Sequence, residues 1–311
     1  MKKVVVFGGG TGLSCLLSGL KLFPIDVTTI ITVSDNGSST GVLKEELDIP
    51  AVGDVGKVLL SMANVDEDFV RLLRYRFQKS GSLYNHPVRN VILAALIDLK
   101  GSLSEATQYM ARLLQVRGTV LPLSEERIEL VGENGPEKYY GEEEVSRHAT
   151  HIQRLSYDHD IRICKEIKEK VAEADLIIFS PGSLYTSILP HLIAPEVLEA
   201  LNATAAPIMY ISNLVTQPGE TDGYNVSDHL RVLDKYLGER HVDVVIANNG
   251  KIDERIRERY LTSEGKNVVE LDEVETARVI AGDIFSIDEE DKIRHNELKT
   301  AYLVFSYLME E

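Results

Sequence analysis

Short hydrophobic runs alternate with amphipathic stretches along most of the chain. Five runs are apolar at nearly every position, as expected for strands buried on both faces of a parallel sheet: residues 3–7, 27–33, 175–179, 207–211 and 242–246. Apolar residues recur at helical spacing in six segments: 13–22, 54–62, 66–77, 88–99, 103–114 and 161–172. This alternation predicts a Rossmann-like, three-layer α/β/α fold with a mostly parallel sheet.

The alternation is interrupted between about residues 118 and 156. Segments 119–122, 127–131 and 137–140 alternate polar with apolar residues, and a Gly-Glu-Asn-Gly-Pro hairpin signal precedes the last of them. We predict a small antiparallel β insertion here, suited to a lid or a subunit contact, within a single domain spanning residues 1–311. The acidic residues 142–144 are interpreted as a solvated surface.

After residue 246 the pattern predicts smaller elements. They are a helix at 252–260, short strands at 267–270 and 278–281, and a closing helix that begins near Arg294.

Composition narrows the classes of partner. The 311 residues contain 33 Lys and Arg against 49 Asp and Glu, and the resulting net charge of -16 argues against a nucleic-acid or acidic membrane partner. No apolar run reaches the roughly 18 residues that a membrane-spanning helix needs, and the chain opens with a strand, so we expect a cytoplasmic protein. Cys15 and Cys164 are interpreted as structural core thiols, and no Cys/His spacing indicates zinc.

Two glycine- and hydroxyl-rich loops follow the first two predicted strands. Gly9, Gly10, Thr11 and Gly12 stand between a strand and a helix, where backbone N–H groups bind phosphate, although the spacing also suits a tight turn without a ligand. In the second loop, residues 34–41, Asp35 and Asn36 could contact a ribose, orient a hydroxyl or hold a divalent ion; a phosphate nest or a solvated turn remains the alternative.

The helical segment that follows offers two further features. Asp54, after Gly53, is interpreted as a helix cap. The sequence Asn-His-Pro at 85–87 precedes a helix that carries Arg89 and Asn90, and His86 there could face an anion or belong to a capping turn.

The third and fourth loops carry the strongest signals. Residues 180–187 place small and hydroxyl side chains between a strand and a helix, which is typical of an anion site. Residues 213–229 form a polar connection much longer than α/β units usually have, at the end of a buried strand. Ligands of open α/β sheets bind at this carboxyl edge, so we predict a binding site there.

Four motifs together resemble the YvcK/CofD-like family, and specifically its bacterial branch, whose members are called gluconeogenesis factors. They are GGGTGL at Gly8, SDNGSSTG at Ser34, SPGSLYTSILP at Ser180 and NLVTQPGETDGY at Asn213. The resemblance covers nearly the whole chain. It implies a Rossmann-like cytosolic protein that binds a nucleotide sugar of the UDP-N-acetylglucosamine type and is needed for cell shape and wall integrity on gluconeogenic carbon sources. The related CofD enzymes transfer a 2-phospho-lactate group from a guanosine diphosphate donor to the deazaflavin alcohol Fo, using magnesium.

The resemblance implies ligand contacts at matching positions. They are Gly9, Gly10, Thr11, Gly12, Asp35, Asn36, His86, Asn90, Pro181, Gly182, Ser183, Tyr185, Thr186, Asn213, Thr216, Gln217 and Gly219. Two segments depart from the pattern. Gly56-Lys57 stands where the family has Arg-Asn, and the segment from Asn85 to Asn90 replaces Gly-His-Ser-Leu-Gly-Asn, so contacts from that side of the pocket are in question.

These observations leave two main classes of function. The first is a regulatory sensor of a nucleotide sugar, with unidentified protein partners. The second is a CofD-like transferase, in which Asp35 would hold magnesium or the acceptor hydroxyl, and Glu220 or Asp222 could assist. A dinucleotide-dependent oxidoreductase fits less well, because the glycine fingerprint is imperfect and no hydride-transfer constellation is recognisable.

Two residues outside the motifs complete the candidate site. Arg294 could neutralise a diphosphate, or it could form an exposed Arg-His pair with His295 on the surface. Tyr260 could stack on a base, or it could simply pack at the end of a helix. The edge of the β insertion makes a homodimer reasonable.

Overall fold

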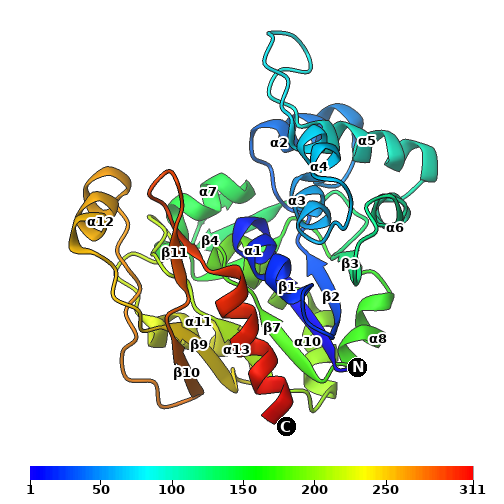
Figure 1. Ribbon diagram of the computed structural model, residues 1–311. Coiled ribbons are helices and arrows are strands. Elements are labelled where there is room, and N and C mark those ends of the chain that lie inside the picture. Colours follow the sequence, from blue (N-terminus) through cyan, green and yellow to red (C-terminus); the bar gives the residue numbers. More distant parts are fainter. Residues whose placement is uncertain (311) are drawn as a thin grey trace.

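Seven parallel strands form the centre of the computed structural model, which describes residues 1–310 (Figure 1). They are β1 (Lys3–Gly8), β2 (Asp26–Ile31), β3 (Thr119–Pro122), β7 (Leu176–Phe179), β8 (Ile208–Ile211), β9 (Val244–Asn248) and β10 (Arg278–Gly282). All strands but the edge strand β10 are largely buried, as their apolar sequences require. The predicted Rossmann-like α/β fold is therefore confirmed.

The order of the strands places a crevice at one point of the sheet. It is β10-β9-β8-β7-β1-β2-β3, so the chain moves outward from β1 in one direction and then returns to build the other half from β7. In such doubly wound sheets, ligands bind outside the carboxyl ends of the two strands where the direction reverses. Here those strands are β1 and β7, which end at the first and third loops.

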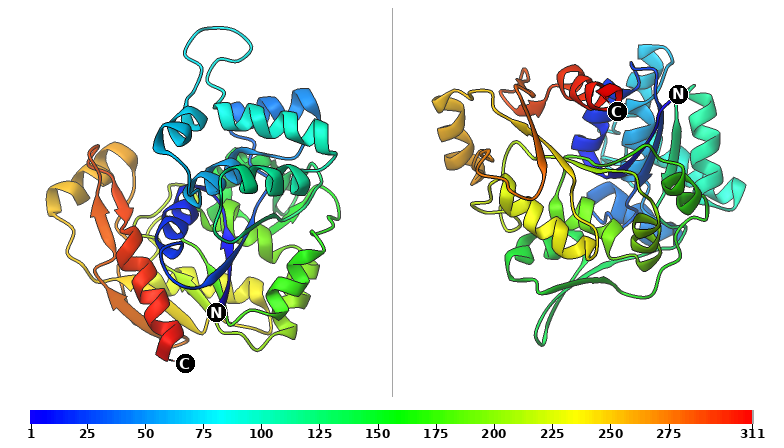
Figure 2. Two further views of the ribbon diagram at one scale, coloured as in Figure 1. Left: turned by 45° about the vertical axis from the view of Figure 1, so that its right-hand side comes forward. Right: turned by 90° about the horizontal axis from the view of Figure 1, so that it is seen from below.

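Two hydrophobic cores cover the two faces of the sheet. Helices α1 (Gly10–Leu20), α3 (Gly53–Ser61), α4 (Glu67–Arg74), α5 (Val88–Lys100), α6 (Leu103–Leu113) and α13 (Glu297–Glu310) contribute to the first core, and α2 (Ser38–Leu47) joins its edge. Helices α7 (Gly141–His148), α8 (Glu166–Ala172), α9 (Leu189–Leu192), α10 (Pro195–Ala203) and α11 (Val226–Leu237) contribute to the second. Figure 2 shows α13 packed alongside α1, with the C-terminus near the N-terminal strand.

The insertion is smaller than the sequence pattern suggests. Its antiparallel sheet consists of β4 (Leu130–Asn134), β5 (Glu137–Tyr140) and β6 (Arg154–Tyr157), and the β4–β5 hairpin projects from the rest of the molecule (Figure 2, right). Segment 119–122, which we expected within the insertion, pairs in parallel with β2 as β3 and belongs to the main sheet.

Several smaller elements differ from the sequence prediction. Arg294 does not begin the closing helix, because it lies on β12 (Ile293–His295), paired with β11 (Phe285–Ile287), and α13 begins at Glu297. Segment 267–270 forms a single bridge, Val215 to Val268, instead of a strand. The predicted helix at 252–260 consists of α12 (Glu254–Arg259) followed by a π-helical turn (Tyr260–Glu264). Other short turns are Ala149–His151 and Leu184–Ile188.

Within residues 1–310, no helix is long and apolar enough to cross a membrane.

Candidate functional site

The first and third loops pack tightly against each other at the crevice. A Cβ atom placed on Gly12 would lie 2.2 Å from the carbonyl oxygen of Pro181, and one on Gly8 would lie 2.0 Å from the Ser180 Oγ. The contact of Gly12 is with backbone atoms, so glycine is required there, whereas the hydroxyl beside Gly8 belongs to a side chain that can rotate. The glycines of the first loop therefore serve close packing of the two loops, as well as access to the backbone.

Asn213, at the end of β8, joins the fourth loop to the third. Its Oδ1 accepts a hydrogen bond from the Gly182 N–H at 2.9 Å, and its Nδ2 donates to the Gly182 carbonyl oxygen at 2.8 Å. Ser183 caps the following turn by accepting from the Thr186 N–H at 3.0 Å. The three loops are thus held in one arrangement by hydrogen bonds within the protein, which is the preorganisation that a binding site needs.

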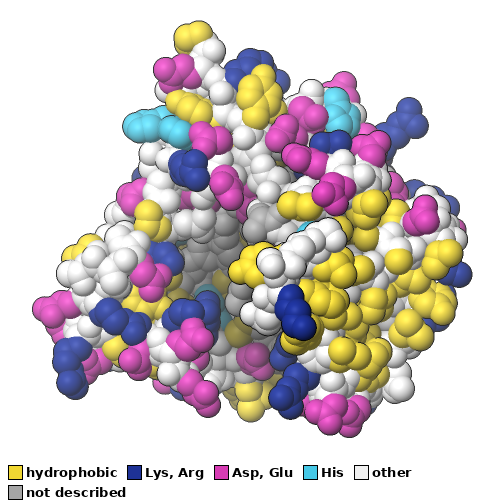
Figure 3. Space-filling view, turned by 90° about the horizontal axis from the view of Figure 1, so that it is seen from above, with side chains coloured by type: hydrophobic (Ala, Val, Ile, Leu, Met, Phe, Trp, Pro, Cys, Tyr) yellow, Lys and Arg dark blue, Asp and Glu magenta, His cyan; other side chains and the backbone are white. Residues whose placement is uncertain are grey.

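These loops enclose a compartment of about 290 Å³, which we call the glycine-loop compartment. It adjoins a larger compartment of about 760 Å³ between α1, α3, α4 and the β12–α13 segment, which we call the basic compartment. Thr11, Cys15, Arg294 and His295 line both, so the two form one continuous cleft. The space-filling view onto this edge of the sheet shows the hollow, with Lys and Arg side chains at its rim (Figure 3).

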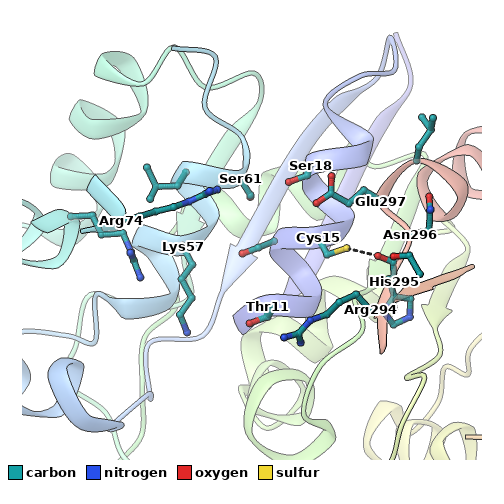
Figure 4. A pocket seen from close by; sticks show the side chains of 15 residues that line it. Thr11, Cys15, Ser18, Lys57, Ser61, Arg74, Arg294, His295, Asn296 and Glu297 are labelled. Atoms are coloured by element: carbon teal, nitrogen blue, oxygen red, sulfur yellow. Dashed lines mark hydrogen bonds between the residues drawn. The ribbon is translucent and has the colours of Figure 1, made fainter. Parts of the chain in front are cut away.

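Cations gather on the walls of this cleft although the chain is strongly acidic. Lys57, Arg74 and Arg89 line the basic compartment, Lys266 lines the glycine-loop compartment, and Arg294 lies at the junction. Figure 4 shows Lys57 and Arg74 on one side of α1 and Arg294 on the other. The cleft is therefore suited to an anionic ligand.

Asp54 is not the cap of its own helix, and the sequence interpretation was wrong on this point. Its Oδ2 accepts a hydrogen bond from the Gly10 N–H at 2.8 Å, and its Oδ1 accepts one from Lys57 Nζ at 2.8 Å. Because Asp54 occupies the Gly10 N–H, an anion in the glycine-loop compartment must use other donors. Lys57 offsets the carboxylate charge that such an anion would meet.

Glu142 joins the carboxylates at this edge and is not part of a solvated surface. Its backbone N–H donates to Asn36 Oδ1 at 3.1 Å, and its Oε1 accepts from Thr186 Oγ1 at 3.3 Å. Burial, followed by the neighbouring carboxylates of Asp35 and Asp54, raises the pKa of Glu142 well above its usual range. Glu142 is therefore protonated at neutral pH, and the insertion delivers a neutral carboxyl group beside Asp35.

We expect Glu142→Gln to stabilise the protein at neutral pH by about 1–2 kcal/mol. The pKa of Glu142 is higher in the folded state than in the unfolded state. At pH values between these two pKa values, unfolding releases a proton, so the stability of the wild-type protein falls as pH rises. Glutamine does not ionise, so the stability gained by Glu142→Gln should be absent near pH 4 and should grow towards pH 8. Urea unfolding at several pH values measures it. Glu143→Gln, on the exposed side of the same helix, should show no such trend; a gain independent of pH would contradict the assignment.

Glu220 lies at the centre of a buried hydrogen-bond network. Its carboxylate accepts from Ser146 Oγ at 2.6 Å, from Ser183 Oγ at 2.6 Å and from Gln217 Nε2 at 2.7 Å, and it is fully buried. It thereby joins the insertion helix α7 to the third and fourth loops. Its carboxylate oxygens are consumed by protein donors, so Glu220 is a structural centre of the site rather than an accessible base.

The structure brings together most of the predicted ligand contacts. The following line the glycine-loop compartment: Gly9, Gly10, Thr11, Gly12, Pro181, Gly182, Ser183, Asn213, Thr216, Gln217 and Arg294. Others lie behind it. Tyr185 and Thr186 are buried in the turn after the third loop, and Gly219, with a φ of +86°, packs against the Ser146 carbonyl oxygen of α7.

The remaining predicted residues lie farther from this compartment. Asn36 lines a separate hollow beside Lys44. His86 is buried, with Nδ1 at 2.9 Å from Ser39 Oγ, and the neighbouring Asn90 is buried as well. Tyr260 is packed in the core, and its hydroxyl accepts from the Ile293 N–H at 2.7 Å, so its ring is not available for stacking in this arrangement.

Sequence reasoning missed Cys15 and the cations of α3 and α4. Cys15 was interpreted as a core thiol, but it lines the cleft and its Sγ donates to the His295 carbonyl oxygen at 3.0 Å (Figure 4). Burial raises its pKa to about 12, which leaves it unreactive at neutral pH. Lys57 was noted only as a departure from the family pattern. The helical spacing of α4 predicted its buried face, yet nothing local indicated that Arg74 faces a cleft.

Among residues 1–310, no three His, Cys, Asp or Glu side chains are grouped so that they could hold a metal ion.

Comparisons with known proteins agree on one family. The sequence profile described as 2-phospho-L-lactate transferase CofD matches residues 4–285. The chain is 38% identical to a gluconeogenesis factor of Halalkalibacterium halodurans, over 96% of this chain and 94% of that protein. It is 37% identical to a gluconeogenesis factor of Bacillus subtilis, over 99% and 98%. A crystal structure of the protein BH3568 from Bacillus halodurans superposes with a TM-score of 0.92 at 37% identity, covering 98% of this chain and 99% of that one.

Proposed function

Because this chain belongs to the CofD family and is similar throughout its length to proteins named gluconeogenesis factor, we propose that it is a regulatory protein that binds a nucleotide sugar of the UDP-N-acetylglucosamine type. The observation that carries the proposal is the cleft at the carboxyl edge of β1 and β7. Preformed backbone loops and cations converge there, without a reactive nucleophile.

The diphosphate is assigned to the glycine-loop compartment. The N-terminal turn of α1 borders this space, and the positive end of this helix favours an anion there. The N–H groups of Tyr185 and Thr186, in the turn after Ser183, are already taken by Glu220 and by Ser183 itself. The Gly10 N–H donates to Asp54 and is not available to a ligand. Arg294 and Lys266 line the same space and supply positive charge to it. A guanidinium and an ammonium group beside backbone donors form a common diphosphate site.

The nucleoside and the sugar need room on either side of the diphosphate. The glycine-loop compartment alone is at the small end for such a ligand, but it opens past Thr11 and Arg294 into the basic compartment. Binding there would shift the contacts among the loops and the insertion helix, and a partner protein could sense that change. In this proposal the output supports cell shape and wall integrity during growth on gluconeogenic carbon sources.

The carboxylates of Asp35 and Asp54, beside the neutral carboxyl group of Glu142, favour a second candidate, a CofD-like transferase. Asp35 stands at the end of β2 beside the site, where it could accept a proton from an alcohol or contact magnesium brought by a diphosphate. Phosphoryl-group transfer needs a donor and an acceptor bound together, and the two joined compartments offer that space.

Calorimetric titration with UDP-N-acetylglucosamine, GDP and NAD, each with and without magnesium, tests these alternatives. We expect micromolar, uracil-selective binding without turnover. Arg294→Met should weaken that binding about tenfold or more, because a charge-assisted contact to phosphate is lost. Arg255→Met, which alters an exposed cation outside the cleft, is the control. Guanine-selective, magnesium-dependent binding would favour the transferase, and no binding of any of the three would overturn the proposal.

A further inference from the structure

The basic compartment contains guanidinium groups without acidic partners. In the part of the chain that the structure describes, neither the Arg74 nor the Arg89 side chain has a hydrogen bond or ion pair, whereas Lys57 is paired with Asp54 and Arg294 contacts Asp288. In a chain with 49 acidic residues against 33 Lys and Arg, two neighbouring cations without a carboxylate partner are unexpected. A compartment that binds an anion would explain this arrangement.

Arg89 is the more informative of the two. Only 6% of the surface of Arg89 is exposed, yet the residue lines the compartment. Its Nε has no hydrogen-bond partner among the described residues. A buried guanidinium normally has all its N–H groups satisfied, because an unpaired buried charge is destabilising. Burial, then the positive charges of Arg76 and Arg74, lowers the pKa of Arg89 to about 10, although the weaker effect of the Asp54 carboxylate acts in the opposite direction.

The Arg89 side chain packs against the neighbouring helix α3. It lies across Gly56, with Cδ 3.1 Å from the place that a Cβ of residue 56 would occupy. A Cβ at position 56 would press against this side chain, which would have to shift by a few tenths of an ångström. The acidic residue that lines this compartment, Glu297, stands at the start of α13 beyond α1 and forms no ion pair with either arginine (Figure 4).

We propose that Arg89 and Arg74 form a second anion subsite, which binds a phosphate or carboxylate group in the basic compartment. Planar guanidinium groups bind both kinds of anion in bidentate fashion. The group belongs either to the far end of a nucleotide-linked ligand that extends past Arg294 or to a separate small anion. The subsite does not depend on which nucleotide occupies the glycine-loop compartment.

Thermal unfolding with inorganic phosphate tests the subsite directly. Wild type, Arg89→Met and Arg71→Met are compared from 0 to 20 mM potassium phosphate, with potassium chloride holding the ionic strength constant. Arg71 lies on the same helix as Arg74, is exposed and pairs with Asp68, so its variant is a matched control. For millimolar affinity we expect the Tm of wild type and Arg71→Met to rise by about 2–3 °C at 20 mM.

Arg89→Met should differ from both proteins in its Tm without phosphate and in its response to phosphate. Without phosphate its Tm should exceed that of wild type, since the uncompensated charge is gone, and phosphate should raise it by less than half as much. A variant with lower Tm than wild type and an unchanged phosphate response would mean that Arg89 is structural. An equal rise in all three proteins would mean an adventitious ion only. Either result overturns the subsite.

A second measurement identifies the source of the anionic group. UDP-glucuronate and UDP-N-acetylglucosamine are titrated into wild type and Arg89→Met, with and without 20 mM phosphate. If phosphate and Arg89→Met weaken UDP-glucuronate alone, the subsite takes the far end of a nucleotide-linked acid. If they leave both nucleotide sugars unchanged while the phosphate response of Tm is lost in Arg89→Met, it takes a separate anion. Should no nucleotide bind, the function proposed above fails, and the thermal experiment still decides the subsite.

Discussion

Gly12→Ala should remove nucleotide-sugar binding and lower the free energy of unfolding by about 3 kcal/mol, the upper end of what overpacking a close contact costs. The added methyl group would meet the carbonyl oxygen of Pro181 at 2.2 Å and its carbonyl carbon at 2.7 Å. Both atoms are backbone, so no side-chain rotation can relieve the contact. The first and third loops must separate, and the compartment between them loses its shape. Urea unfolding and calorimetry measure the two effects.

Gly182→Ala is the matched control, because it adds the same methyl group to the facing loop. The nearest atom to that Cβ is the Ser187 Cβ at 3.4 Å, an ordinary contact, and the backbone of Gly182 does not require a glycine. We expect a change in unfolding free energy below about 1 kcal/mol. If Gly12→Ala were tolerated as well as this control, the packing of the two loops would not define the site.

The sheet could be predicted from the sequence because its signals are local. Runs such as 3–7 and 175–179 are apolar at every or nearly every position, and only a strand covered on both faces accommodates that. The loops at the ends of these strands follow from the same pattern, since parallel strands end at one edge. Most residues predicted from the four motifs accordingly line one compartment.

The errors concern side chains whose partners are distant in sequence. Asp54 stands at a helix start, so a cap was the natural local interpretation, yet its partner is Gly10, 44 residues away. The acidic run at 142–144 resembles a solvated surface, but the insertion folds Glu142 back towards Asp35. Local composition does not reveal which face of a helix another loop will cover, and tertiary contact decides both cases.

The two segments that depart from the pattern implied by the resemblance are adjacent in space. Gly56 stands where the resemblance implies an arginine, and Arg89 stands where it implies a glycine. The Arg89 side chain lies directly over Gly56, so a guanidinium still occupies this region and reaches it from α5 instead of α3. In this chain an arginine is therefore available on this side of the pocket, which a linear motif cannot show.

Glu220→Ala should lower the free energy of unfolding by about 3 kcal/mol, because it leaves several buried donors without an acceptor. Ser146, Ser183, Gln217 and the Tyr185 N–H all donate to this carboxylate. Asp222→Ala, in the same loop, removes an exposed carboxylate that accepts from the Gly219 N–H alone, and should cost less than about 1 kcal/mol. Urea unfolding of the two variants measures the difference.

Glu220→Gln separates the role of the oxygen atoms from that of side-chain volume. Oε1 accepts from the Gln217 amide and Oε2 accepts from the Tyr185 N–H. A glutamine can keep its oxygen at the Tyr185 N–H, and its NH2 group then faces the Gln217 amide, which can flip to accept, and the serine hydroxyls, which can rotate. The hydrogen bonds of this network then lose their charged acceptor, and bonds between neutral groups are weaker than charge-assisted ones. We therefore expect Glu220→Gln to recover only part of the stability lost in Glu220→Ala. Full recovery would contradict a carboxylate held by converging donors, and would reduce Glu220 to a residue that fills space between the insertion and the loops.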